Sequence, residues 1–123
     1  MTVRLANITI DCGDALALAR FWSAALGRPL AEEPAPSEYV ASIGGAATHE
    51  SSDEGPNWLF AKVSEGKTAK NRMHVDLVTE DAPAEIDRLV DLGATRVADK
   101  DEWGMQWTVM TDPEGNEFCV ARS

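Results

Sequence analysis

Cysteine is scarce in this chain, and so are basic residues. The 123 residues include two cysteines, Cys12 and Cys119, which are too few for a disulfide scaffold and lack the paired spacing of a zinc-binding motif. Lysine and arginine number 11 against 21 acidic residues, so the formal net charge is −10. Because nucleic acids are bound by clustered cationic side chains, this balance argues against nucleic acid and anionic membranes as partners.

Membrane-directed segments are also missing. No apolar run reaches the roughly 18 residues needed to span a bilayer. The N-terminal residues lack the charged region, apolar stretch and cleavage site of a secretion signal. We therefore expect a soluble, cytoplasmic protein with reduced thiols. Hydrophobic residues make up 44% of the chain, which is enough for one compact domain, residues 1–123, with its own core.

The chain repeats itself with an offset of 67 residues. Segments 7–14 and 74–81 both alternate in the manner of half-buried strands, and both end in an aspartate that can cap a helix. Each segment then continues through a helical pattern to a helix-ending glycine. The repeat indicates a duplicated module. It predicts that Asn7 and His74 occupy equivalent positions across a shared cavity.

The repeat defines two modules, residues 1–66 and 67–123, with the same predicted order of elements. In the first, hydrophobic spacing predicts a helix at 15–26 and strands at 6–12, 28–30, 39–43 and 58–63. In the second, it predicts a helix from Asp81 to Gly93 and strands at 73–78, 95–98, 106–111 and 117–121. Polar segment 46–56 is expected to form a mobile loop, and 64–72 the linker. The predicted class is α+β, with the unit βαβββ written twice.

Three sequence motifs add specificity to this order of elements. They are Phe21–Gly27 in the first helix, Asn71–Asp76 at the start of the second module, and the turn and strand Asp112–Val120. Together they resemble the vicinal oxygen chelate superfamily, which includes glyoxalase I, bleomycin-resistance proteins, fosfomycin-resistance enzymes and extradiol dioxygenases. The similarity covers nearly the whole chain and points to the glyoxalase-like domains. It implies an open, curved barrel of mixed β-sheet with the helices on the convex side.

Metal-using members of this superfamily hold a divalent ion with ligands from the first and last strand of each module. The resemblance places these four positions at Asn7, Ala61, His74 and Cys119. Ala61 has no ligand atom and Asn7 offers only a neutral carbonyl oxygen, so the carboxylates that would neutralise a dication are missing. His74 and Cys119 are acceptable zinc ligands, but Asn7 would have to serve as the third. We therefore expect no metal and no other cofactor.

Several candidate residues have both a functional and a structural interpretation. Asp11 and Asp76 share the strand parity of the two matching positions, so a carboxylate could orient the imidazole of His74 and make it a general base. The alternative is that these aspartates meet solvent or pair with Arg72 or Arg96.

Cys119 and the tryptophans also have both a functional and a structural interpretation. Cys119 could act as a nucleophile only with a cation beside its thiolate, and it could equally be a small packed hydrophobe. Trp22 lies on the apolar stripe of the first helix and is expected in the core. Trp58, Trp103 and Trp107 are expected either to line a pocket for a planar ligand or to pack in the core or a dimer interface.

Two functions follow from these residues. The first is metal-independent binding of a small hydrophobic or aromatic metabolite or drug, in a pocket formed by Asn7, Asp11, Trp58, His74, Trp103, Trp107 and Cys119. The resemblance implies a homodimer in which a partner chain completes the pocket. The alternative is an enzyme of the lyase, isomerase or dioxygenase type, either metal-dependent or with His74 as the catalytic base. A purely regulatory module has no positive feature in the sequence.

Overall fold

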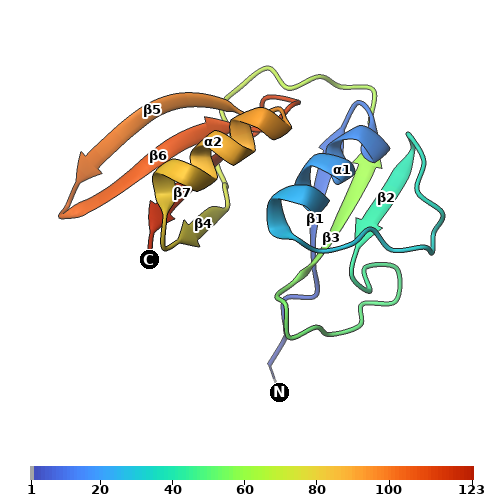
Figure 1. The fold of residues 1–123 in the computed structure, drawn as a ribbon. Helices are drawn as coiled ribbons and strands as arrows, with labels where there is room; N and C mark the ends of the chain where they lie inside the picture. The colour runs from blue at the N-terminus through green and yellow to red at the C-terminus, as the bar shows by residue number, and fades with distance from the viewer. Residues whose placement is uncertain (1) are drawn as a thin grey trace. The chain divides into compact units, whose positions relative to one another are not determined.

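The computed structural model describes residues 2–123, which form two compact units. The boundary between them along the chain lies between Gly66 and Lys67. Each unit combines one sheet with one helix (Figure 1). The first contains β1 (Asn7–Cys12), α1 (Ala15–Leu26), β2 (Val40–Ile43) and β3 (Asn57–Lys62). The second contains β4 (Asp76–Thr79), α2 (Ala82–Leu92), β5 (Thr95–Glu102), β6 (Met105–Thr111) and β7 (Glu117–Arg122). The predicted α+β class is confirmed.

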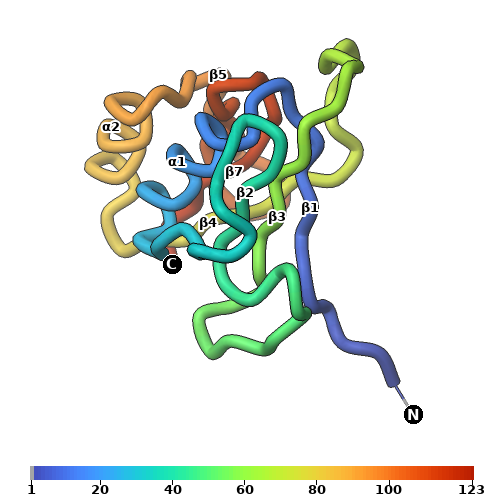
Figure 2. Tube along the Cα trace, turned by 90° about the vertical axis from the view of Figure 1, so that its right-hand side faces the viewer, coloured from blue at the N-terminus to red at the C-terminus, as the bar shows by residue number. Residues whose placement is uncertain are grey.

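Both sheets pair their first strand in parallel with their last. The strand order is β1-β3-β2 in the first unit and β4-β7-β6-β5 in the second, and Figures 1 and 2 show β1 alongside β3. In this pairing Thr9 lies opposite Leu59, and Asp76 lies opposite Cys119. Thr9 and Asp76 each precede their helix-capping aspartate by five residues. The first-unit equivalent of Cys119 is therefore Leu59 rather than Ala61.

The two helices begin and end at the residues that the sequence predicts. Asp14 accepts a hydrogen bond from Ala17 N at 3.1 Å, which satisfies one of the free N–H groups in the first turn of α1. Asp81 accepts from Ala84 N at 3.2 Å at the start of α2. Gly27 ends α1 with a φ of 66°, a left-handed conformation that glycine adopts without steric cost. Within residues 2–123, neither helix combines the length and apolarity needed to cross a bilayer.

The core of the first unit lies between α1 and its sheet. Trp22 is buried, as predicted, and its ring stacks on that of Trp58 with centroids 4.9 Å apart. Trp58 is only 4% exposed and also lies against Phe60, whose ring centroid is 6.3 Å away. Burying each large apolar side chain contributes roughly 1.5–3 kcal/mol. Trp58 is thus a core residue, which corrects the expectation that it lines a ligand pocket.

In the second unit, α2 packs on one face of the sheet and leaves the other face without a helix. Ile86 and Leu89 of α2 are buried, as are Phe118 and Val120 of β7. Successive side chains of a strand point to opposite faces, so Cys119 faces away from the side on which Val120 lies. The strand partners of Cys119 share its face, and they include Asp76. The face of the sheet opposite α2 therefore carries Asp76 and Cys119.

One strand predicted for the first unit does not form. Residues 28–30 were expected to form a strand, but they contribute only an isolated bridge between Leu30 and Ile43. Pro29 has no N–H to donate to a ladder, and the N–H of Arg28 is already bonded to Ser23 O at the end of α1. The first unit therefore has three full strands.

Two boundaries in the second unit also differ from prediction. The strand expected at 73–78 begins at Asp76, so His74 precedes β4 rather than lying within it. The strand expected at 95–98 continues to Glu102, where it pairs with Met105 across a two-residue turn. Antiparallel pairing along the hairpin supports this strand despite its charged sequence, because cross-strand hydrogen bonds do not depend on side-chain hydrophobicity.

Candidate functional site

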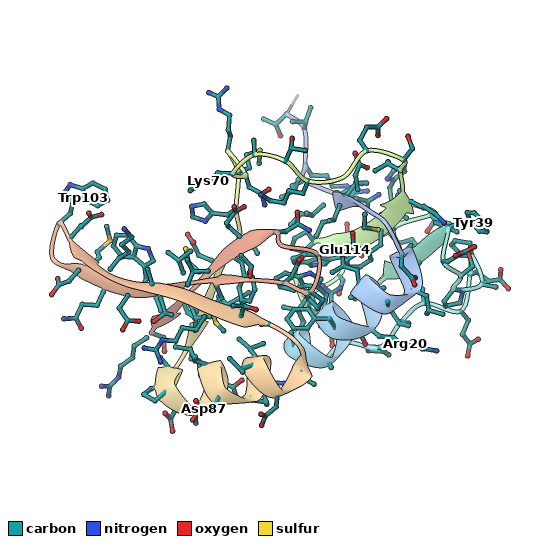
Figure 3. All side chains as sticks on the ribbon, turned by 90° about the horizontal axis from the view of Figure 1, so that it is seen from above. Arg20, Tyr39, Lys70, Asp87, Trp103 and Glu114 are labelled. Atoms are coloured by element: carbon teal, nitrogen blue, oxygen red, sulfur yellow. The ribbon has the colours of Figure 1, made fainter. Side chains whose placement is uncertain are left out.

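The turn between β5 and β6 places a tryptophan in an unusual backbone conformation. Trp103 and Gly104 form this turn with φ angles of 55° and 76°, and two successive positive φ values are those of a type I′ turn. Glycine accepts such angles readily, whereas a bulky residue is strained there. Trp103 lies at the hairpin tip (Figure 3) and is 82% exposed. The turn therefore carries a large aromatic ring where asparagine or glycine would be less strained.

Trp103 stacks over Trp107, which lies on β6. The ring centroids are 6.1 Å apart and the planes differ by 14°. Both rings line a cavity of about 790 Å³ that is formed by residues of the second unit. Its other lining residues include Met105, His74, Asp76 and Cys119. Four of the sequence-predicted site residues, Trp103, Trp107, His74 and Cys119, are thus brought together.

At one place in this cavity, three side chains with potential ligand atoms converge. His74 Nδ1 lies 3.2 Å from Asp76 Oδ1 and 3.8 Å from Cys119 Sγ. One ligand atom from each residue lies within 4.8 Å of the other two. Asp76 is therefore a neighbour of His74, as the general-base hypothesis requires. Arg96, its alternative partner, is instead paired with Asp99 at 2.9 Å.

The thiol of Cys119 has little nucleophilic character in this setting. Burial, followed by the negative charge of Asp76 and a hydrogen bond with that carboxylate, raises the pKa of Cys119 above its ordinary range. A thiol with a raised pKa stays protonated at neutral pH, and the thiolate is the reactive species. The hypothesis of a nucleophilic Cys119 therefore finds no electrostatic support.

Asn7, the first-unit counterpart of His74, ties down a loop. Its Nδ2 donates to Ala46 O at 2.9 Å and lies 3.0 Å from Nδ1 of His49. Its Oδ1 accepts a hydrogen bond from Asn57 Nδ2 at 3.3 Å. The loop between β2 and β3, residues 44–56, follows a folded path in Figure 2. These contacts give Asn7 a structural role in the first unit.

Asn57 is the centre of this arrangement, and sequence reasoning did not identify it as a functional or anchoring residue. It is 1% exposed, accepts from Gly45 N at 3.0 Å and donates to Glu50 O at 2.6 Å. A Cβ at Gly44, whose φ is 78°, would lie only 2.3 Å from Asn57 Oδ1. Gly44 is the signal in the sequence, since glycine is favoured where the backbone has a positive φ and another group approaches it closely.

The family's four metal positions do not fit a divalent ion in this chain. The Oδ1 of Asn7, its only metal-binding atom, already accepts a hydrogen bond from Asn57. The last-strand position of the first unit is aliphatic, whether it is assigned to Leu59 or to Ala61. Two of the four donors are thus engaged or missing, and the first unit supplies no negative charge at these positions.

Asp11, the remaining candidate, belongs to the first unit. It lies exposed on β1 opposite Ala61. Its contribution to ligand binding stays a prediction.

The family model for the glyoxalase-like domain matches residues 7–121. The chain belongs to the glyoxalase-like domain family. This places it in the vicinal oxygen chelate superfamily, as the motifs predicted. Among curated protein sequences, none matches this chain.

Solved structures share the fold at low sequence identity. A glyoxalase/bleomycin resistance protein/dioxygenase family enzyme from Burkholderia phytofirmans PsJN matches with a TM-score of 0.76 and 16% identity, over 98% of each chain. The fosfomycin resistance protein FosX from Listeria monocytogenes matches with a TM-score of 0.73 and 11% identity, over 100% of this chain and 95% of its own. A superfamily member from Sphaerobacter thermophilus has a TM-score of 0.67 and 18% identity, over 99% and 98%. These likenesses concern the fold.

Proposed function

We propose that this protein binds a small planar or hydrophobic molecule, a metabolite or drug, in the cavity of the second unit, and that binding needs no metal ion. The observation that carries the proposal is the stacked pair of Trp103 and Trp107 on the cavity wall. The cavity's volume of about 790 Å³ falls in the range typical of small-molecule sites, roughly 300–1,000 Å³.

The surrounding side chains suit such a ligand. The two indole rings and Met105 offer flat and polarisable apolar surface. His74 and Asp76 add polar groups that can fix the orientation of a ligand. A strained, exposed tryptophan at a turn is costly for stability, and such strain is found most often where a residue serves binding.

Tryptophan fluorescence tests this proposal directly. Planar aromatic compounds should quench the emission of the metal-free protein with a saturable dependence on concentration. Trp103→Ala should raise the Kd of a quenching compound roughly 3- to 10-fold, because one aromatic pair contributes about 0.5–1.5 kcal/mol. Trp103→Phe should recover most of the affinity, since it keeps a flat ring.

Tyr39→Ala provides the matched control, because Tyr39 is an exposed aromatic residue of the first unit. Its removal should leave the Kd unchanged. An aromatic library that changes neither the emission nor the melting temperature of the wild-type protein would refute the proposal. Equal losses in Trp103→Ala and Tyr39→Ala would remove the assignment to this cavity.

We further propose that the protein is a cytoplasmic homodimer. Cys12 and Cys119 are both buried free thiols, which suits a reducing compartment. Light scattering coupled to size-exclusion chromatography would give the mass in solution, to be compared with 13.3 kDa for one chain. A monomer at micromolar concentration would contradict the dimer.

A second candidate function, a proton-transfer enzyme of the lyase or isomerase type, is favoured by one contact. Asp76 lies 3.2 Å from the imidazole of His74, and a carboxylate at this distance holds one ring nitrogen so that the other can accept a proton. His74 would then be the general base at the cavity. Turnover of a glutathione hemithioacetal, measured with and without added divalent metals, tests this candidate. His74→Gln should abolish any turnover found.

A further inference from the structure

The geometry points to a site for a thiophilic divalent cation, of the Zn²⁺ class, built from His74, Asp76 and Cys119 of the second unit alone. This differs from the family's arrangement, which draws ligands from both modules and whose four ligand positions do not include that of Asp76. It also goes beyond the proposed ligand binding, which does not depend on the cation.

The two distances from His74 Nδ1 to the other donor atoms are close to those around a tetrahedral ion. With ordinary Zn–N, Zn–O and Zn–S bond lengths and tetrahedral angles, an N···O edge is about 3.3 Å and an N···S edge about 3.6 Å. The corresponding distances from His74 Nδ1 are 3.2 Å to Asp76 Oδ1 and 3.8 Å to Cys119 Sγ. All three donor atoms lie within 4.8 Å of one another.

The charge of the cluster also suits a dication. One carboxylate and one thiolate supply two negative charges, and a neutral imidazole completes the set. On binding, the S–H bond of Cys119 breaks, its electron pair forms the Zn–S bond, and its proton leaves to solvent. Two negative charges for a dication are therefore available within the second unit alone.

The surroundings leave room for further ligands of the ion. Cys119 is 6% exposed, whereas His74 and Asp76 are more open and all three line the cavity. Zinc sites with three protein ligands keep their fourth position for water or an incoming oxygen. An ion here would therefore be accessible from the same cavity as the aromatic ligand.

Cobalt(II) substitution gives a spectroscopic test on the full-length protein. Titration of metal-free protein with Co²⁺ should produce a thiolate-to-cobalt charge-transfer band in the near ultraviolet and saturate at one ion per chain. Added Zn²⁺ should remove the band by displacement. Cys119→Ser should abolish it, and His74→Ala and Asp76→Asn should weaken Co²⁺ binding by about tenfold or more.

Two control variants separate this site from the alternatives. Asn7→Ala, at the family's first-strand position, and Cys12→Ser, the other cysteine, should both retain the band. Circular dichroism establishes that each variant is folded. Absence of the band in the folded wild-type protein would overturn the proposal, and so would loss of the band in Asn7→Ala. Failure here leaves tryptophan quenching by aromatic compounds unaffected, so the two proposals fail independently.

Discussion

Asn57 shows how one buried amide organises a whole loop. Its side chain bonds to Gly45 N, Glu50 O and Asn7 Oδ1, and these contacts span residues 44–56. Asn57→Ala would remove the side-chain partner of two part-buried backbone groups, Gly45 N and Glu50 O. Loss of a hydrogen-bond partner costs up to about 1–3 kcal/mol for each group.

We therefore expect Asn57→Ala to lower the free energy of unfolding by about 2–4 kcal/mol in a urea titration. Hydrogen exchange should accelerate in residues 44–56 first. Asn71→Ala, in the linker, serves as the control and should change stability by less than about 0.5 kcal/mol. Equal effects of the two variants would contradict the anchoring role.

Glu117 is a second residue whose contacts join distant segments. Its carboxylate lies 3.0 Å from Lys67 Nζ and accepts from Asn71 N at 3.0 Å, so it ties the linker to the start of β7. Partial burial alone would raise the pKa of Glu117. The hydrogen bond from Asn71 and the hydrogen bond and charge of Lys67 outweigh this and lower the pKa from 4.5 to about 2.

This pKa predicts a defined loss of stability in acid. Because the folded-state pKa is lowered, the ionised carboxylate stabilises the fold above about pH 4.5, and this stabilisation disappears as the pH falls toward 2. Glu117→Gln should therefore unfold at a lower temperature than wild type at pH 7 and at nearly the same temperature at pH 2. Glu102→Gln, an exposed glutamate of the same unit, should follow wild type throughout. A constant difference between Glu117→Gln and wild type across this range would refute the prediction.

The candidate site could be predicted from sequence only in part. The motif resemblance identified His74 and Cys119, and strand parity left open whether Asp76 contacts His74, pairs with an arginine or meets solvent. The contact between Asp76 and His74 depends on where β4 begins and on side-chain rotation, neither of which periodicity determines. Trp58 was uncertain for a similar reason, because a tryptophan on a strand has the same pattern whether it faces the core or a cavity.

At the level of elements, the turn of the β5–β6 hairpin carries a residue, Trp103, that suits ligand binding but lowers the stability of the turn. A type I′ turn favours asparagine at the position that Trp103 occupies. Trp103→Asn should therefore raise the stability of the fold by a few tenths to about 1 kcal/mol, and should weaken binding of planar compounds roughly 3- to 10-fold. Melting temperature and fluorescence titration measure the two effects on the same sample. A variant that is less stable and binds equally well would contradict both parts.

The helices and strands differ in how fully local sequence determines them. Both helices were predicted because capping aspartates, apolar stripes and terminal glycines all act within a few residues. Two strand predictions differed from the structure. Residues 28–30 were predicted as a strand, but Pro29 has no N–H to donate to a sheet, and β5 is longer than predicted. Strand β5 is charged and depends on its pairing with β6. Strands are stabilised by neighbours that the local sequence does not contain.

At the scale of the whole molecule, the net charge of −10 influences which ligands arrive. The negative field of an acidic protein repels anionic ligands and attracts cationic ones, and salt screens that field over about 10 Å at 0.1 M. Of two planar ligands with the same ring system, the cationic one should associate several-fold faster than the anionic one at low ionic strength. Stopped-flow quenching should show this advantage shrinking as salt is added. A salt-independent ratio would indicate that the net charge does not reach the cavity.

The parallel pairing of first and last strands also makes the two units templates for each other. Asn7, Thr9 and Leu59 stand at the positions that carry histidine, aspartate and cysteine in the second unit. Three substitutions, Asn7→His, Thr9→Asp and Leu59→Cys, would therefore transplant the donor cluster onto a second scaffold within the same chain. The Asn7→His substitution would remove the side-chain amide that bonds to Ala46 O and Asn57 Nδ2 and so would loosen the 44–56 loop. The first unit therefore needs an amide at a position where the second unit can carry histidine.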